Sequence, residues 1–163
     1  MIFKRLIFFF IFFIPFFVVG QNLPLHQIQL KDIKGSRTTL QNALPKQKNI
    51  IISYWATWCG PCKKELDALK TNYAEWQDKY EVELLAISTD DARSAGKVRA
   101  MIQQRKWPYT IYIDTESTSK QVFNFETIPF TVVLDKTGNM VYSHIGYSNG
   151  DEAKLEAALQ EIQ

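Results

Sequence analysis

The chain has 163 residues, and its 19 lysines plus arginines against 17 aspartates plus glutamates give a formal net charge of +2 at pH 7. Two of the positive charges, Lys4 and Arg5, stand before an apolar N-terminal run, so the charge of the remaining chain is balanced. A balanced charge provides no electrostatic footprint for nucleic acid, and we therefore expect no nucleic-acid partner.

The first segment in chain order is typical of a secretory signal peptide. Residues 6–19 form an uninterrupted apolar run that ends before the polar residues Gln21 and Asn22. This run is well short of the roughly 20 apolar residues that a membrane-spanning helix needs. We therefore expect residues 1–20 to be a signal peptide, with an uncleaved membrane anchor as the alternative. Residues 21–163 are then one exported domain, and the expected compartment is the periplasm.

The exported part begins with a predicted hairpin and a strand–helix–strand unit. Residues 28–32 and 37–40 have strand character and flank a turn at Gly35. A short apolar run at residues 48–55 predicts a buried strand, and the pattern of an amphipathic helix follows it. Residues 82–88 predict the next buried strand, which completes a parallel βαβ unit.

The second half of the chain adds an insertion and a second hairpin. Its predicted elements are a helix at 92–106, a strand at 110–113, a short helix at 117–123, a hairpin of strands at 131–134 and 140–145, and a last helix at 151–162. The order of elements predicts an α/β sandwich with a mixed central sheet, an N-terminal β-hairpin and a helix–strand insertion.

The two cysteines of the sequence, Cys59 and Cys62, lie where the first buried strand passes into its helix. At a helix N-terminus, free backbone N–H groups and the helix dipole favour the thiolate of Cys59 over its thiol. Cys62 lies one turn further on, close enough to attack a sulfur bonded to Cys59 and so resolve a mixed disulfide. Pro61 suits the first helical turn and stiffens the loop between the sulfurs.

A cysteine pair of this spacing is also half of a zinc site. A structural zinc ion usually needs four protein ligands, and the two histidines, His26 and His144, lie far apart and lack ligand spacing. We therefore expect no metal and no cofactor other than a redox-active disulfide between Cys59 and Cys62.

The stretch Trp-Cys-Gly-Pro-Cys-Lys at residues 58–63, after a buried strand, resembles the active site of the thioredoxin superfamily. The export segment, the hairpin, the insertion at 92–113 and Cys-Lys-Lys-Glu at 62–65 resemble its TlpA/ResA-like branch. The resemblance implies a thioredoxin-like three-layer sandwich and a thiol–disulfide oxidoreductase. In many relatives the activity reduces disulfides of exported proteins, often in cytochrome c maturation. It also implies protein substrates and an electron donor in the membrane that the sequence does not identify, and we expect a monomer.

The resemblance assigns further site residues around the cysteines. Ile128 and Pro129 fit the second hallmark of the superfamily, a cis-proline that faces the cysteines, although an ordinary turn before the next strand is the alternative. The backbone of Ile128 is then expected to bind a substrate strand, and Trp58, Gly60 and Pro61 complete the expected substrate-binding surface.

Glu65 is the third candidate for a catalytic residue, because it lies three residues past Cys62 on the same helix face. In ResA-like relatives the matching acid tunes the thiols, and a carboxylate there can accept a proton. The alternative is a solvated helix residue. Thioredoxin has a buried aspartate at the place of Ser53, so any acid role here passes to Glu65.

Phe130 stands where members of the superfamily often have a small hydroxyl residue after the cis-proline. This difference predicts a more apolar substrate groove.

Several other residues have simpler interpretations. We expect Asp90 and Asp91 to belong to a solvated loop, Trp55 and Trp58 to pack around the disulfide, and His144 to face solvent or a backbone carbonyl. A further group of aromatic residues is expected in the core: Trp107, Tyr109, Tyr112, Phe123 and Phe125.

The direction of electron flow has two readings. Gly60 and Pro61 form the thioredoxin dipeptide, which among relatives goes with reductants, whereas an oxidant or isomerase of periplasmic disulfides is the alternative. Two other classes of protein are further alternatives. A thiol peroxidase lacks support because the pattern Pro-x-x-x-Thr-x-x-Cys is absent, and a copper-handling module lacks a histidine near the dithiol.

Overall fold

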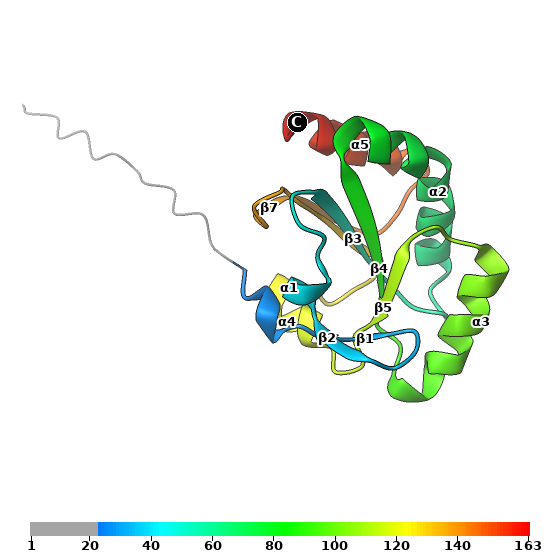
Figure 1. The fold of residues 1–163 in the computed structure, drawn as a ribbon. Coiled ribbons are helices and arrows are strands. Elements are labelled where there is room, and N and C mark those ends of the chain that lie inside the picture. The colour runs from blue at the N-terminus through cyan, green and yellow to red at the C-terminus, as the bar shows by residue number, and fades with distance from the viewer. Residues whose placement is uncertain (1–22) are drawn as a thin grey trace, which may run out of the picture.

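The computed structural model describes residues 23–163, and the predicted signal peptide lies outside the described residues. A seven-stranded sheet with the order β2-β1-β5-β4-β3-β6-β7 forms the centre of the molecule (Figure 1). The strands are β1 (Gln29–Asp32), β2 (Arg37–Thr39), β3 (Asn49–Trp55), β4 (Val82–Ser88), β5 (Thr110–Ile113), β6 (Phe130–Leu134) and β7 (Met140–Ile145). The three strands β3, β4 and β5 are parallel and all other pairs are antiparallel, so the predicted mixed sheet is confirmed.

Helices cover both faces of the sheet and make three layers (Figure 1). One face carries α2 (Gly60–Tyr80), α3 (Ala95–Arg105) and α5 (Asp151–Glu161), and the other carries α1 (Leu40–Ala43), α4 (Thr118–Phe123) and the 3-10 helix η1 (Leu25–Gln27). The predicted three-layer sandwich, N-terminal hairpin and helix–strand insertion are therefore confirmed. Within residues 23–163, no helix combines the length and the apolar character needed to cross a membrane.

Strand β3 explains why the sequence shows an unbroken apolar run there. All seven of its residues are buried, because a strand with helices on both sides has no solvated face. Ile51 and Trp55 pack into the core beneath α2, whereas Ile52 and Tyr54 pack into the core on the α4 side. The strand is thus anchored from both sides immediately before the cysteine motif.

The observed elements differ from the predicted ones mainly at their ends. The short helices η1 and α1 were not expected, and α1 begins where the Thr39 hydroxyl accepts a hydrogen bond from the Asn42 N–H. The predicted helix at 92–106 begins with a 3-10 turn, η2 (Ala92–Ser94), that leads directly into α3. The Asp91 side chain caps this turn at the Ser94 N–H.

Candidate active site

The cysteine pair lies at the junction of β3 and α2, as the sequence predicts. Cys59 is the N-cap residue of α2, and the Cys62 N–H donates a hydrogen bond to its Sγ at 3.2 Å. The two sulfurs form a disulfide in the structure. Gly60 and Pro61 between them are exposed, and Pro61 occupies the first helical turn. The backbone N–H contact is the feature that stabilises negative charge on Cys59 once the disulfide is reduced.

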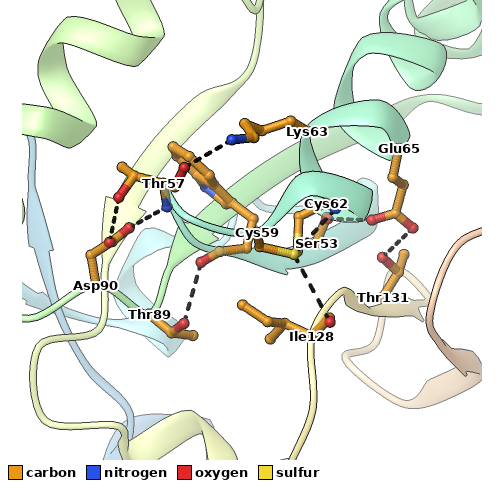
Figure 2. The surroundings of a disulfide bond; sticks show 11 residues. Ser53, Thr57, Cys59, Cys62, Lys63, Glu65, Thr89, Asp90, Ile128 and Thr131 are labelled. Carbon is orange, nitrogen blue, oxygen red and sulfur yellow. Dashed lines mark hydrogen bonds between the residues drawn. A yellow bond between two sulfur atoms is a disulfide. The ribbon is translucent and has the colours of Figure 1, made fainter.

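The peptide bond between Ile128 and Pro129 is cis, as predicted. The carbonyl oxygen of Ile128 lies 4.0 Å from Cys59 Sγ, so this loop faces the cysteines (Figure 2). The Pro129 carbonyl accepts a hydrogen bond from the Gly146 N–H at 2.8 Å, which ties the loop to the end of β7. Backbone groups of Ile128 therefore stand beside the sulfur that a substrate must reach.

Trp58 does not pack around the disulfide, and that prediction is wrong for this residue. Its side chain is 73% exposed, whereas Trp55 is fully buried and packs edge-on against Trp107 with 5.0 Å between ring centroids. The difference arises because the chain leaves the sheet after Trp55 and turns outward before the helix begins. Trp58 borders a shallow surface hollow of about 430 Å³ whose other wall is α3, with Lys97 and Met101 among its lining residues.

Asp90 is buried and is not part of a solvated loop, so that prediction is also wrong. Its carboxylate accepts hydrogen bonds from the Thr57 N–H at 2.8 Å, the Thr57 hydroxyl at 2.7 Å and the Ser88 hydroxyl at 2.8 Å. The parallel pairing of β3 with β4 brings the ends of both strands together, which places Asp90 against the chain that leads to Cys59. Lys63 donates to the Thr57 carbonyl from the opposite side at 3.0 Å (Figure 2). Asp91, in contrast, is exposed.

Glu65 is the buried acid of the site. Only 2% of its surface is exposed, so the alternative of a solvated helix residue is excluded. Its Oε2 accepts a hydrogen bond from the Ser53 hydroxyl at 2.9 Å, and its Oε1 accepts one from the Thr131 hydroxyl at 2.9 Å (Figure 2). These two donors offset part of the cost of burying a carboxylate. Cys62 and Glu65 share one face of α2 and both are buried.

His144 is the third partner of Glu65, which contradicts the expectation that it faces solvent or a backbone carbonyl. Its Nε2 lies 3.0 Å from Glu65 Oε1, and only 16% of the side chain is exposed. The sheet register explains the contact. Ser53 pairs with Thr131 on the neighbouring strand, and Thr131 pairs with His144 on the next, so the three side chains form one row on the face beneath α2.

Phe130 lies on the opposite face of the sheet from this row. It is buried and stacks on Phe125 with 4.4 Å between ring centroids, in the core on the α4 side. Successive residues of a strand point to opposite faces, so a strand that directs Thr131 towards Glu65 directs Phe130 away from it. The predicted apolar contribution of Phe130 to the groove is therefore wrong.

The remaining aromatic predictions agree with the structure. Trp107, Tyr109, Phe123 and Phe125 are buried, and Tyr112 is half-buried against the core on the α4 side. Among residues 23–163, no three histidine, cysteine or acidic side chains come together in a group that could hold a metal ion.

Residues 19–143 match the family model described as the AhpC/TSA family. The chain belongs to this family. It is 32% identical over 128 residues to a thioredoxin-like protein, YneN, of Bacillus subtilis (strain 168), which covers 78% of this chain and 71% of that protein. It is 29% identical over 148 residues to a thiol–disulfide oxidoreductase, ResA, of Bacillus cereus, covering 91% of this chain and 75% of that protein.

A solved structure supports the same assignment. The solution structure of an uncharacterized thioredoxin-like protein from Porphyromonas gingivalis superimposes with a TM-score of 0.76 and 35% identity, covering 86% of this chain and 92% of that one. The expected thioredoxin-like fold and the resemblance to the ResA-like branch are therefore confirmed. Together with the disulfide at the N-terminus of α2, these relatives also confirm the expected enzyme class, a thiol–disulfide oxidoreductase.

Proposed function

We propose that this oxidoreductase reduces disulfides of exported proteins, with Cys59 as nucleophile and Cys62 as resolving thiol. The observation that carries the proposal is the position of Cys59 at the N-terminus of α2, with the Ile128 carbonyl 4.0 Å from its sulfur. A nucleophilic sulfur and a backbone acceptor for an extended substrate chain thus stand side by side. Cys62 is fully buried behind them, where a resolving thiol is shielded from solvent.

The reaction transfers two electrons from the protein dithiol to the substrate disulfide. The Cys59 thiolate attacks one substrate sulfur, the substrate S–S bond breaks, and a mixed disulfide with Cys59 forms. Cys62 then loses its proton and attacks Cys59 Sγ, which breaks the bond to the substrate and leaves the disulfide between Cys59 and Cys62. Each departing substrate thiolate takes up one proton. These two protons match the one that Cys59 loses when it ionises and the one that Cys62 loses before its attack.

Glu65 is the proposed acceptor of the Cys62 proton. It is the buried carboxylate on the same face of α2, and its three partners, Ser53, Thr131 and His144, all lie at hydrogen-bond distance. Hydrogen-bond donors offset part of the cost of burying a carboxylate. A carboxylate on the helix face of the resolving thiol can act as general base, which fits the role inferred for Glu65 from the sequence.

The substrate-binding surface is proposed to consist of the backbone of Ile128 and Pro129, the exposed Gly60 and Pro61, and Trp58. Recognition through backbone groups and one exposed indole suits protein substrates of varied sequence, because neither contact depends on a particular substrate side chain. The enzyme then needs no cofactor beyond its own disulfide.

The proposed cellular role is supported by the N-terminal sequence and by the dipeptide between the cysteines. Residues 1–20 are proposed to export residues 21–163 to the periplasm, as a signal peptide or as an anchor. Gly60 and Pro61 favour a reductant. A place in cytochrome c maturation is proposed because the chain is similar to a protein named ResA, and the resemblance to that branch implies such a role in many relatives. We further propose a monomer that receives its electrons from a membrane protein.

Reduction of insulin tests the proposed direction. The reduced full-length protein should cleave the insulin disulfides at a rate that depends on both cysteines, with negligible turnover of hydrogen peroxide and no retained copper. Oxidation of reduced substrate proteins in preference to insulin cleavage would instead identify an oxidant, and rapid peroxide turnover a peroxidase.

A further inference from the structure

The carboxylate of Glu65 lies in a strongly acidic setting. Besides Glu65, the small cavity between α2, β7 and α5 is lined by Asp151 and Glu152, and His144 is the single basic side chain among the described residues that line it. Like charges at short range disfavour the ionised form of a buried carboxyl group. Some group must therefore offset this effect if Glu65 is to receive a proton.

The lysine and the tyrosines near this cavity do not supply that offset. Lys154 is engaged by Asp151 at 2.8 Å and lowers the pKa of that carboxyl group. The Tyr147 hydroxyl donates to Glu152 at 2.6 Å, and burial together with this carboxylate raises the pKa of Tyr147 to about 12. Burial also raises the pKa values of two further tyrosines that face Glu65, Tyr109 before β5 and Tyr142 on β7. All three tyrosines are therefore neutral near pH 7.

His144 contacts Glu65 directly, as the Ser53 and Thr131 hydroxyls do, and of these three residues it is the one that lines the cavity together with Asp151 and Glu152. Its Nε2 is 3.0 Å from Glu65 Oε1. A carboxylate can only accept hydrogen bonds, so Nε2 carries a hydrogen whenever Glu65 is ionised. The other ring nitrogen, Nδ1, is buried and has no hydrogen-bond partner among the described residues. His144 therefore acts on Glu65 as a hydrogen-bond donor through Nε2, and its ring also packs against Tyr142 with 5.6 Å between ring centroids.

We propose that His144 is a positioning residue that holds Glu65 in its ionised, proton-accepting form and so extends resolution of the mixed disulfide to lower pH. The inference rests on the proposed function, because it concerns the step in which Cys62 gives its proton to Glu65 and attacks Cys59 Sγ, releasing the substrate as a thiolate. A hydrogen bond from the Nε2–H group is stronger to a carboxylate than to a neutral carboxylic acid, so this contact favours the ionised form of Glu65.

The test separates the two sulfur steps with 5,5′-dithiobis(2-nitrobenzoate). Attack by Cys59 on this aromatic disulfide releases one coloured thiolate, and resolution by Cys62 releases the second. The leaving thiolate needs no proton, so the pH dependence of the second phase reports the deprotonation of Cys62. The measurement uses the reduced full-length protein and follows both phases across the acid range.

We compare His144→Gln, which keeps a donor towards Glu65, with His144→Leu, which removes it. The acid limb of the second phase should move to higher pH by about one pH unit for His144→Leu, which is about a tenfold loss of rate at a fixed acid pH, and by clearly less for His144→Gln. Ser143→Ala is the matched control, because Ser143 is exposed on the other face of β7. It should behave as the wild type.

Coincident acid limbs in the wild type and His144→Leu would overturn the inference, as would a rate loss of equal size at every pH. If His144→Leu does not fold, His144→Phe decides the question, because it keeps an aromatic ring and has no hydrogen-bond donor. Failure of the proposed function would be seen in the wild type, as a missing second phase or as a first attack by Cys62. Failure of the inference about His144 would leave both phases of the wild type intact, so the two failures are distinguishable.

Discussion

Thr131 and His144 are register partners on β6 and β7, and both contact the same oxygen atom, Oε1 of Glu65, at 2.9 and 3.0 Å. The pairing of the C-terminal hairpin therefore determines which side chains meet the acid of α2. Glu65 lies three residues after Cys62 in the helix, so strand register is connected to the chemistry of the resolving thiol through one carboxylate.

Replacement of Glu65 by glutamine should slow resolution without slowing the first attack. An amide cannot accept the Cys62 proton, so we expect the second phase of the dithiobis(nitrobenzoate) reaction to fall by about 100-fold near neutral pH. The acid limb set by Glu65 should be replaced by a steady rise of the rate with pH, because Cys62 must then lose its proton to solvent. The first phase, which depends on Cys59, serves as the internal control. A second phase with unchanged rate and pH dependence would show that another group accepts the proton.

Removal of the Asp90 carboxylate should destabilise the protein, because this carboxylate holds the segment that leads to Cys59. Asp90→Ala leaves the Thr57 N–H, the Thr57 hydroxyl and the Ser88 hydroxyl without their acceptor, and the free energy of unfolding should fall by about 1–3 kcal/mol. Asp91→Asn is the control, since it keeps a cap at the exposed neighbouring position and should stay within about 0.5 kcal/mol of the wild type. Urea unfolding measures both. Equal stability of the two variants would contradict a stabilising role for the hydrogen bonds that Asp90 accepts from Thr57 and Ser88.

The two tryptophans beside the motif should respond in opposite ways to truncation. Trp58→Ala removes a side chain that is 73% exposed, so stability should change by less than about 0.5 kcal/mol while insulin reduction slows. Trp55→Ala removes a fully buried side chain and should cost about 3–5 kcal/mol. Turnover of insulin, compared with that of a small disulfide, isolates the binding contribution of Trp58. An equal loss with both substrates would argue against protein recognition by this residue.

The stability of the fold should fall in acid partly through Glu83 on β4. Burial by itself raises the pKa of Glu83, but hydrogen bonds from Lys48 and from the Tyr73 hydroxyl outweigh it and lower that pKa below its ordinary value of 4.5. A carboxyl group with a lowered pKa in the folded state stabilises the protein above its ordinary pKa, and the contribution is lost as the pH falls below it. Glu83→Gln should therefore flatten the decline of the unfolding free energy below about pH 4.5. Parallel pH profiles of the two proteins would exclude this contribution.

Much of the fold follows from local sequence patterns. The unbroken apolar run of β3 and the spacing of Leu66, Leu69 and Tyr73 along α2 predict a buried strand and an amphipathic helix, because such patterns reflect which faces are covered. The cysteine pair and Pro129 are likewise evident in the sequence. These features depend on residues close together in the chain.

The contacts of His144 and Asp90 depend instead on which strands become neighbours. The alternation of Tyr142 and His144 along β7 indicates that they share a face, but only the pairing of β7 with β6 places that face beneath α2. A shift of this register by one residue moves His144 to the opposite face. In the same way, Asp90 meets Thr57 because β3 and β4 end side by side. Strand pairing is a property of the assembled sheet, so sequence reasoning missed both residues.

In the proposed mechanism, Cys59 attacks the substrate and Cys62 resolves the intermediate. The most direct test of this mechanism is the trapping of mixed disulfides with the full-length variants Cys62→Ala and Cys59→Ala, produced in the native host and followed by mass spectrometry of the adducts. We predict that Cys62→Ala accumulates disulfide-linked partner proteins through Cys59, and that Cys59→Ala accumulates few or none because Cys62 is buried. Equal or better trapping by Cys59→Ala would contradict the assignment of nucleophile and resolving thiol.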